Sequence, residues 1–112
     1  MTKYKRGDIV LVDFGFSEGI GSKKRPTLII SSDDYHKSRQ EVIIVAITGN
    51  IRREYFGDTK IDKWKEAGLI CPSMVTGIIR TIKDNMIIHK LGTLLQEDFQ
   101  KVKRNIDKAI GF

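Results

Sequence analysis

A short stretch of the sequence combines small residues with cations directly before an apolar run. It contains, in order, Gly21, Ser22, Lys23, Lys24 and Arg25. Glycine lets backbone N–H groups approach an anion, and a guanidinium offers two parallel hydrogen bonds to phosphate oxygens. The residue types therefore suit a phosphate-binding loop. Taken alone, however, the stretch favours a plainer interpretation, in which these are solvated loop charges that Pro26 separates from a strand.

The stretch is not the phosphate-binding loop of a nucleotide-binding protein. That loop requires Gly-Lys-Ser or Gly-Lys-Thr at the start of a helix. Here the order is Gly-Ser-Lys, and the residues that follow form a β-branched, strand-like run. We therefore exclude ATP and GTP as ligands of this loop.

Polar residues also stand at the end of the most apolar run, which covers 41–48. Thr48 and Asn50 lie at its exit, and Arg52 and Arg53 follow in the same loop. Polar groups held at the end of a rigid strand are well placed to bind a ligand. A threonine at the end of a strand is also common without any such role, so its position alone does not decide between the two.

The elements that must position these residues are mainly strands. Five β-branched runs bounded by turn residues predict strands at 8–14, 26–32, 41–48, 73–79 and 85–91. Several are almost continuously apolar, which favours strands buried on both faces of a small closed or half-closed barrel. Short helices are predicted in 31–40 and in 62–68, the latter between a capping Asp62 and a terminating Gly68. An amphipathic C-terminal helix is predicted from the spacing of Phe99, Val102, Ile106 and Ile110.

Length and charge bound the class of protein. The 112 residues suffice for one domain, which we expect to cover 1–112, and the fold class is predicted as a mainly β small barrel. A formal net charge of +6 favours an anionic partner, which RNA, DNA or an acidic protein segment would each satisfy. The longest strongly apolar run, 42–47, is too short to span a membrane, so we expect a cytoplasmic protein with no membrane partner.

The remaining chemically distinctive side chains favour structural roles. Cys71 is the single cysteine, which excludes an internal disulfide, fits a reducing compartment and is expected to fill a small space in the core. His36 is expected to be exposed and His89 to be a strand residue, and neither has a partner at metal-ligand spacing, so no metal or cofactor is predicted. Trp64 is expected to hold its short helix against the barrel, with stacking on a base as the alternative.

Five segments together resemble the PemK/MazF family of type II toxins in order and spacing. They are "KRGDIVLVDFGF", "GSKKRPTLIIS", "VAIT", "WKEAGLICPSMV" and "RTIKDNMIIHKLGTL", and they cover nearly the whole chain. The resemblance implies an SH3-like barrel, a two-fold homodimer and sequence-selective, metal-independent cleavage of single-stranded mRNA. It also implies attack by a 2′-hydroxyl, with a 2′,3′-cyclic phosphate and a 5′-hydroxyl as the product ends.

The resemblance assigns roles to particular residues. Arg25 and Thr48 match the catalytic arginine and threonine of the family. A guanidinium aimed at the reacting phosphate stabilises charge that builds in the transition state, and a threonine hydroxyl can hold the phosphate or the attacking group in position. The residues expected to bind RNA, by charge, by small size or by position in the family, are Gly21, Ser22, Lys23, Lys24, Asn50, Arg52 and Ser73.

The chain departs from the family at three places. Other branches carry an arginine and an acidic residue for proton transfer where this sequence has Thr76 and Ile78, and a histidine in the first loop that is absent here. The general acid and base therefore stay unassigned. The family also implies an acidic antitoxin whose disordered tail folds along the basic groove, in a complex that binds operator DNA. The alternative is a non-catalytic barrel that binds nucleic acid or a protein target such as gyrase.

Overall fold

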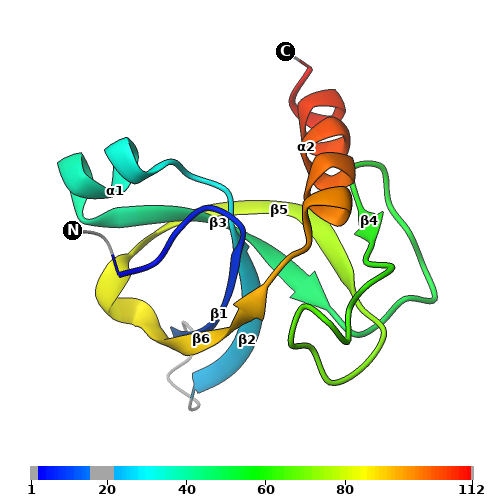
Figure 1. Cartoon of the computed structure of the whole chain (residues 1–112), viewed down its shortest axis with the longest axis horizontal. Helices are drawn as coiled ribbons and strands as arrows, with labels where there is room; N and C mark the ends of the chain where they lie inside the picture. Colours follow the sequence, from blue (N-terminus) through cyan, green and yellow to red (C-terminus); the bar gives the residue numbers. More distant parts are fainter. Residues whose placement is uncertain (1–2, 16–21, 112) are drawn as a thin grey trace.

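A computed structural model describes residues 3–15 and 22–111 and shows a strongly curved antiparallel sheet with one long helix beside it (Figure 1). The elements are β1 (Asp8–Gly15), β2 (Ser22–Ile29), α1 (Asp33–Arg39), β3 (Glu41–Thr48), β4 (Thr59–Lys60), β5 (Met74–Lys83), the 3-10 turn η1 (Asp84–Met86), β6 (Ile87–Thr93) and α2 (Gln96–Ile110). The six strands follow the order β4-β5-β3-β2-β1-β6. The mainly β fold and the C-terminal helix are as predicted.

Both faces of the central strands are buried, as the near-continuous apolar runs predicted. Neighbouring residues of one strand enter different cores: Ile9 and Val10 of β1 do so, and so do Ile44 and Val45 of β3. The first core lies between the sheet, α2 and the 61–69 segment, and we call it the helix-side core. The second core lies on the opposite face of the sheet and is joined by Tyr4, and we call it the barrel core.

The C-terminal helix packs on the sheet through its apolar face. Val102 and Ile106 are buried and Phe99 is half-buried against the helix-side core, as predicted. Ile110 was expected on the same face but is exposed, because α2 ends at that residue, where Gly111 takes a left-handed conformation (φ 86°). Among the described residues, no helix has the length and apolarity needed to cross a lipid bilayer.

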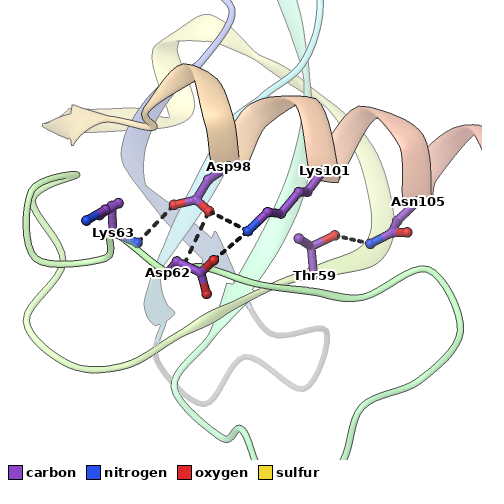
Figure 2. Close-up of polar contacts among 6 residues, drawn as sticks. All are labelled: Thr59, Asp62, Lys63, Asp98, Lys101 and Asn105. Carbon is purple, nitrogen blue, oxygen red and sulfur yellow. Dashed lines mark hydrogen bonds and ion pairs between the residues drawn. The ribbon is translucent and has the colours of Figure 1, made fainter.

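The predicted helix at 62–68 is wrong in detail. The segment is a series of turns in which Ala67, Gly68 and Leu69 donate to carbonyls four, three and five residues back, so no regular helix forms. Its start is instead fastened to α2, because the buried Asp98 carboxylate accepts hydrogen bonds from the backbone N–H groups of Asp62 and Lys63 (Figure 2). Gly68 does end the segment, with φ 95°. Trp64 packs against the helix-side core, as predicted.

Two other side chains differ from expectation. His36 is buried, because α1 packs beside β3 and Ser31 bridges them: its hydroxyl contacts His36 Nε2 and accepts the N–H of Ile43. Cys71 is exposed rather than in the core, because it lies in the loop before β5. His89 lies on β6, as predicted, and is exposed.

Candidate functional site

A cavity of about 790 Å³ opens on the face of the sheet that carries Ile44 of the barrel core. Its walls come from β2, β3, β5 and the loop 49–58 that joins β3 to β4. Four of the residues predicted from the sequence to be catalytic or to bind RNA line it: Lys23, Arg25, Thr48 and Asn50. The cavity is therefore the place where the two predicted chemical stretches of the sequence meet.

Strand register explains why Arg25 and Thr48 share this cavity. β2 and β3 pair antiparallel, and Thr27 stands opposite Ala46 as the last pair of that ladder. Arg25 lies two residues before Thr27, and Thr48 lies two residues after Ala46. Because side chains alternate along a strand, all four residues belong to the same face, and the same register places Arg25 opposite Thr48.

The cations at 23–25 lie in strand β2 rather than in a loop before it. The strand begins at Ser22 and includes Pro26, which pairs with Leu11 of β1. Pro26 was expected to mark the strand boundary. It is accommodated inside β2 because the pairing with β3 starts only at Thr27, so one side of β2 is an open edge there and a missing N–H costs no bond on that side.

The turn after β3 is fixed by local hydrogen bonds. Thr48 Oγ1 accepts the backbone N–H of Asn50 at 3.1 Å, and Asn50 Oδ1 accepts the N–H of Arg52 at 3.3 Å. Side chains that accept the N–H two residues ahead stabilise a tight turn. Thr48 keeps its hydroxyl proton for another acceptor, since it acts as the acceptor in the described bond.

Three of the other residues expected to bind RNA are not among the residues that line the cavity: Lys24, Arg52 and Ser73. Lys24 and Arg52 are exposed but do not line it, and alternation along β2 turns Lys24 to the face opposite Arg25. Ser73 is buried, and its hydroxyl donates to the carbonyl of Cys71 at 2.8 Å. The structure describes the backbone of Ser22 in β2, whereas Gly21 lies outside the described residues.

One wall of the cavity was not predicted from the sequence. Tyr55 and Phe56 line it with 60% and 79% of their surfaces exposed, and the Arg53 guanidinium lies 4.9 Å from the centre of the Tyr55 ring. We call Arg53, Tyr55 and Phe56 the aromatic wall. Two adjacent exposed aromatics beside an arginine are a feature of proteins that stack on nucleic-acid bases. The sequence signal, Arg-Arg-Glu-Tyr-Phe-Gly in a polar loop, was present but was used only for its arginines.

The aromatic wall is held by a buried carboxylate. Asp58 Oδ2 accepts the N–H of Tyr55 at 2.9 Å, and Asp58 Oδ1 accepts the N–H of Gly77 in β5 at 3.2 Å. Both carboxylate oxygens are therefore bonded to backbone, and the residue is 7% exposed. Asp58 consequently ties the loop to the sheet instead of presenting a free carboxylate to the cavity.

The positions where proton-transfer residues were sought do reach the cavity. Thr76 and Ile78 both line it, together with Arg80. The Thr76 hydroxyl donates to the carbonyl of Ala46 at 2.8 Å and accepts the N–H of Ile78 at 3.2 Å. Thr76 is therefore engaged with the backbone, and neither it nor Ile78 carries a group that titrates near neutral pH.

The charge of the cavity is strongly positive. Of the described residues that line it, four carry a positive charge, and the one carboxylate is Asp58, which is bonded to backbone; the cations are Lys23, Arg25, Arg53 and Arg80. No group of histidine, cysteine and carboxylate side chains within residues 3–15 and 22–111 has the arrangement of a metal site. The cavity thus combines cations, hydroxyl groups and exposed aromatic rings, which suits a single-stranded polyanion that carries bases.

Comparison with known proteins agrees with this geometry. Residues 5–110 match the family model of the "PemK-like, MazF-like toxin of type II toxin-antitoxin system". The chain is 30% identical over 109 residues to an endoribonuclease MazF from Staphylococcus saprophyticus, covering 96% of this chain and 91% of that protein. Among solved structures, a MazE–MazF structure from Deinococcus radiodurans gives a TM-score of 0.82 at 14% identity, covering 100% of this chain and 99% of that one. Mycobacterium tuberculosis toxin MazF-mt6 gives 0.77 at 22%, covering 94% and 97%. The chain belongs to the family of PemK-like, MazF-like toxins of type II toxin-antitoxin systems.

Proposed function

We propose that this protein is an endoribonuclease toxin that cleaves single-stranded mRNA in a sequence-selective way, without a metal ion. The observation that carries the proposal is that Arg25 and Thr48 line one cationic cavity from neighbouring strands. A similar protein, 30% identical over nearly its whole length, is named an endoribonuclease. Acting on mRNA, the toxin would work in the cytoplasm.

The proposed reaction is an internal transfer at one phosphodiester. The ribose 2′-oxygen bonds to the adjacent phosphorus, and the bond from phosphorus to the 5′-oxygen of the next nucleotide breaks. The proton lost by the 2′-hydroxyl is balanced by the proton gained by the 5′-oxygen. The products are a 2′,3′-cyclic phosphate and a 5′-hydroxyl.

Arg25 and Thr48 divide the work of this step. The charge on the non-bridging oxygens grows toward the transition state, so a guanidinium held there stabilises the transition state more than the bound RNA. Thr48 has a hydroxyl proton to donate, because in its described bond it accepts from Asn50. It therefore orients a phosphate oxygen or the attacking group.

RNA binding is proposed to use the remaining cations and the aromatic wall. Lys23, Arg53 and Arg80 line the cavity and would contact flanking phosphates. The exposed rings of Tyr55 and Phe56 would stack on unpaired bases, which explains a requirement for single-stranded RNA. Asn50 would contact RNA inside the cavity. Lys24 and Arg52 would extend the contact beyond the cavity mouth, while Ser73 would contribute through its position in the loop before β5.

Partners are proposed from the family. One proposed partner is a second copy of the chain, in a two-fold homodimer. The other is an acidic antitoxin whose tail lies along the cationic cavity. Each would cover charged or apolar surface that is exposed in one chain. Among the similar structures are a mycobacterial endoribonuclease in complex with its cognate antitoxin, of TM-score 0.79 at 18% identity over 97% of this chain and 96% of that one, and the MazE–MazF structure. The toxin–antitoxin complex is proposed to bind operator DNA.

The test of the proposed function is direct. The purified protein is incubated with a long single-stranded RNA in EDTA, and the cut ends are mapped and their phosphate chemistry determined. Cleavage at a common short sequence, with cyclic phosphate and 5′-hydroxyl ends, is expected. Loss of cleavage in EDTA, or 5′-phosphate ends, would overturn the mechanism.

A non-catalytic role is the second candidate. It is favoured by one observation: among the described lining residues, none has a free group suited to proton transfer near neutral pH. A protein of this kind would bind RNA or a protein target such as gyrase in the same cavity. The EDTA experiment separates the two, because binding without any cut supports the non-catalytic role.

A further inference from the structure

The long helix α2 touches the cavity loop, although none of the described lining residues belongs to α2. Asn105 Nδ2 donates to the backbone carbonyl of Asp58 at 3.2 Å and to Thr59 Oγ1 at 2.7 Å, the latter bond being drawn in Figure 2. These bonds join residues that are far apart in the sequence. They fix the point at which the 49–58 loop turns into β4.

Shape as well as hydrogen bonding holds this turn against α2. Gly57 has φ 98° and sits so that an added Cβ would lie 3.0 Å from Ala109 Cβ and 3.9 Å from Gly77 Cα. The turn is therefore fitted between a helix and a strand. A displacement of α2 at Asn105 or Ala109 would therefore move the turn directly.

Asp58 links the contact with α2 to the aromatic wall. Its backbone carbonyl accepts from Asn105, while its carboxylate accepts the N–H groups of Tyr55 and Gly77. The carboxylate is buried, so breaking either of its hydrogen bonds would cost free energy. The side chain and the backbone of Asp58 therefore move together with the turn. The chain of contacts runs from Asn105 through Asp58 to Tyr55.

We infer that Asn105 is a positioning residue for substrate binding, which sets the aromatic wall from the far side of the sheet through Asp58. For its effect on RNA, this inference rests on the proposed function. Arg25 and Thr48 are carried by β2 and β3, and no described hydrogen bond joins Asn105 to them. Asn105 therefore controls how tightly RNA binds, whereas the chemical step depends on Arg25 and Thr48.

The first experiment measures the contact chain without RNA. Amide hydrogen exchange of Tyr55 and Gly77 is followed by NMR in the full chain, in Asn105→Ala and in Asn105→Asp, whose ionised carboxylate can only accept. Gln100→Ala, an exposed amide on the same helix, is the control. Exchange of both amides should rise about five- to tenfold in the two Asn105 variants and stay unchanged in the control. Unchanged exchange would overturn the inference.

The second experiment measures RNA cleavage by the same four proteins. KM should rise about five- to tenfold in the Asn105 variants while kcat stays within about twofold. A merely structural role would instead raise exchange throughout the chain and lower kcat through loss of folded protein, and that result would overturn the inference. Faster amide exchange with an unchanged KM would also overturn the inference. If the unaltered protein cuts no RNA, the proposed function fails, and RNA affinity in place of KM then decides whether Asn105 positions the wall.

Discussion

Thr27 of β2 stands opposite Ala46 of β3, and this pair sets the register that brings the predicted catalytic residues together. Two residues further along each strand, on the same face, come Arg25 and Thr48, and both line the same cavity. Neither residue is close to the other in the sequence. The antiparallel register of two strands, not a local motif, therefore builds the candidate site.

Arg25 is expected to dominate the chemical step. Arg25→Ala should lower single-turnover RNA cleavage by about a hundredfold or more, because one preorganised donor to the reacting phosphate is lost. Folding should persist, since the side chain is exposed at the rim. Arg104→Ala, an exposed arginine on α2, is the matched control and should cleave normally. Equal rates for the protein with and without Arg25 would remove this residue from the mechanism.

Lys23 and Lys24 form a matched pair that tests which face of β2 meets RNA. Lys23 lines the cavity, whereas Lys24 does not. Lys23→Ala should therefore weaken RNA binding and reduce the slope of log affinity against log salt by about one. Lys24→Ala should produce the smaller change in both quantities. The reverse ranking would show that RNA follows the other face of the strand.

Tyr55 and Phe56 should contribute stacking energy to RNA binding. Tyr55→Ala or Phe56→Ala should each weaken binding of single-stranded RNA by about 1–3 kcal/mol, the usual loss when a base loses an aromatic partner. Tyr55→Phe keeps the ring and should bind nearly normally. Titration with a fluorescent RNA measures all three. Equal losses in Tyr55→Ala and Tyr55→Phe would point to the hydroxyl rather than to stacking.

The strands were predictable because their signal is local. Runs of β-branched residues gave β1 and β3 closely, and their continuity correctly indicated burial on both faces. The start of β2 was missed because Pro26 suggested a boundary. Whether a proline ends a strand depends on which neighbour is present at that point, and Pro26 lies where β3 is not yet paired. The two-residue β4 is too short to leave any pattern.

The site was predicted only in part for a similar reason. Arg25 and Thr48 were found through family resemblance, and the structure places them in one cavity. The aromatic wall was not found, because its role depends on contacts that cross the whole chain. Asp58 reaches Gly77 and is in turn held by Asn105, and nothing in the local sequence around Tyr55 announces those partners.

The ion pair that fastens the 61–69 segment to α2 should make stability depend on pH in a defined way. Lys101 donates a hydrogen bond to Asp62 and also lies 3.7 Å from Asp98 Oδ1 (Figure 2). The hydrogen bond and the positive charge of Lys101 lower the pKa of Asp62 below its ordinary value of 3.8. Because the folded pKa is the lower one, this contribution is fully present above pH 3.8 and is lost as the pH falls through the folded pKa.

The free energy of unfolding in urea should therefore differ between Asp62→Asn and the unaltered protein at pH 7. The two values should converge in acid. The difference should be modest, since the side chains of Lys101 and Asp62 are 43% and 65% exposed to solvent. Lys101→Met supplies the control. In a protein that carries this substitution, Asp62→Asn should change the free energy of unfolding by the same amount at pH 7 and in acid. A pH-independent difference in the presence of Lys101 would mean that the ion pair between Asp62 and Lys101 is not the source of the effect.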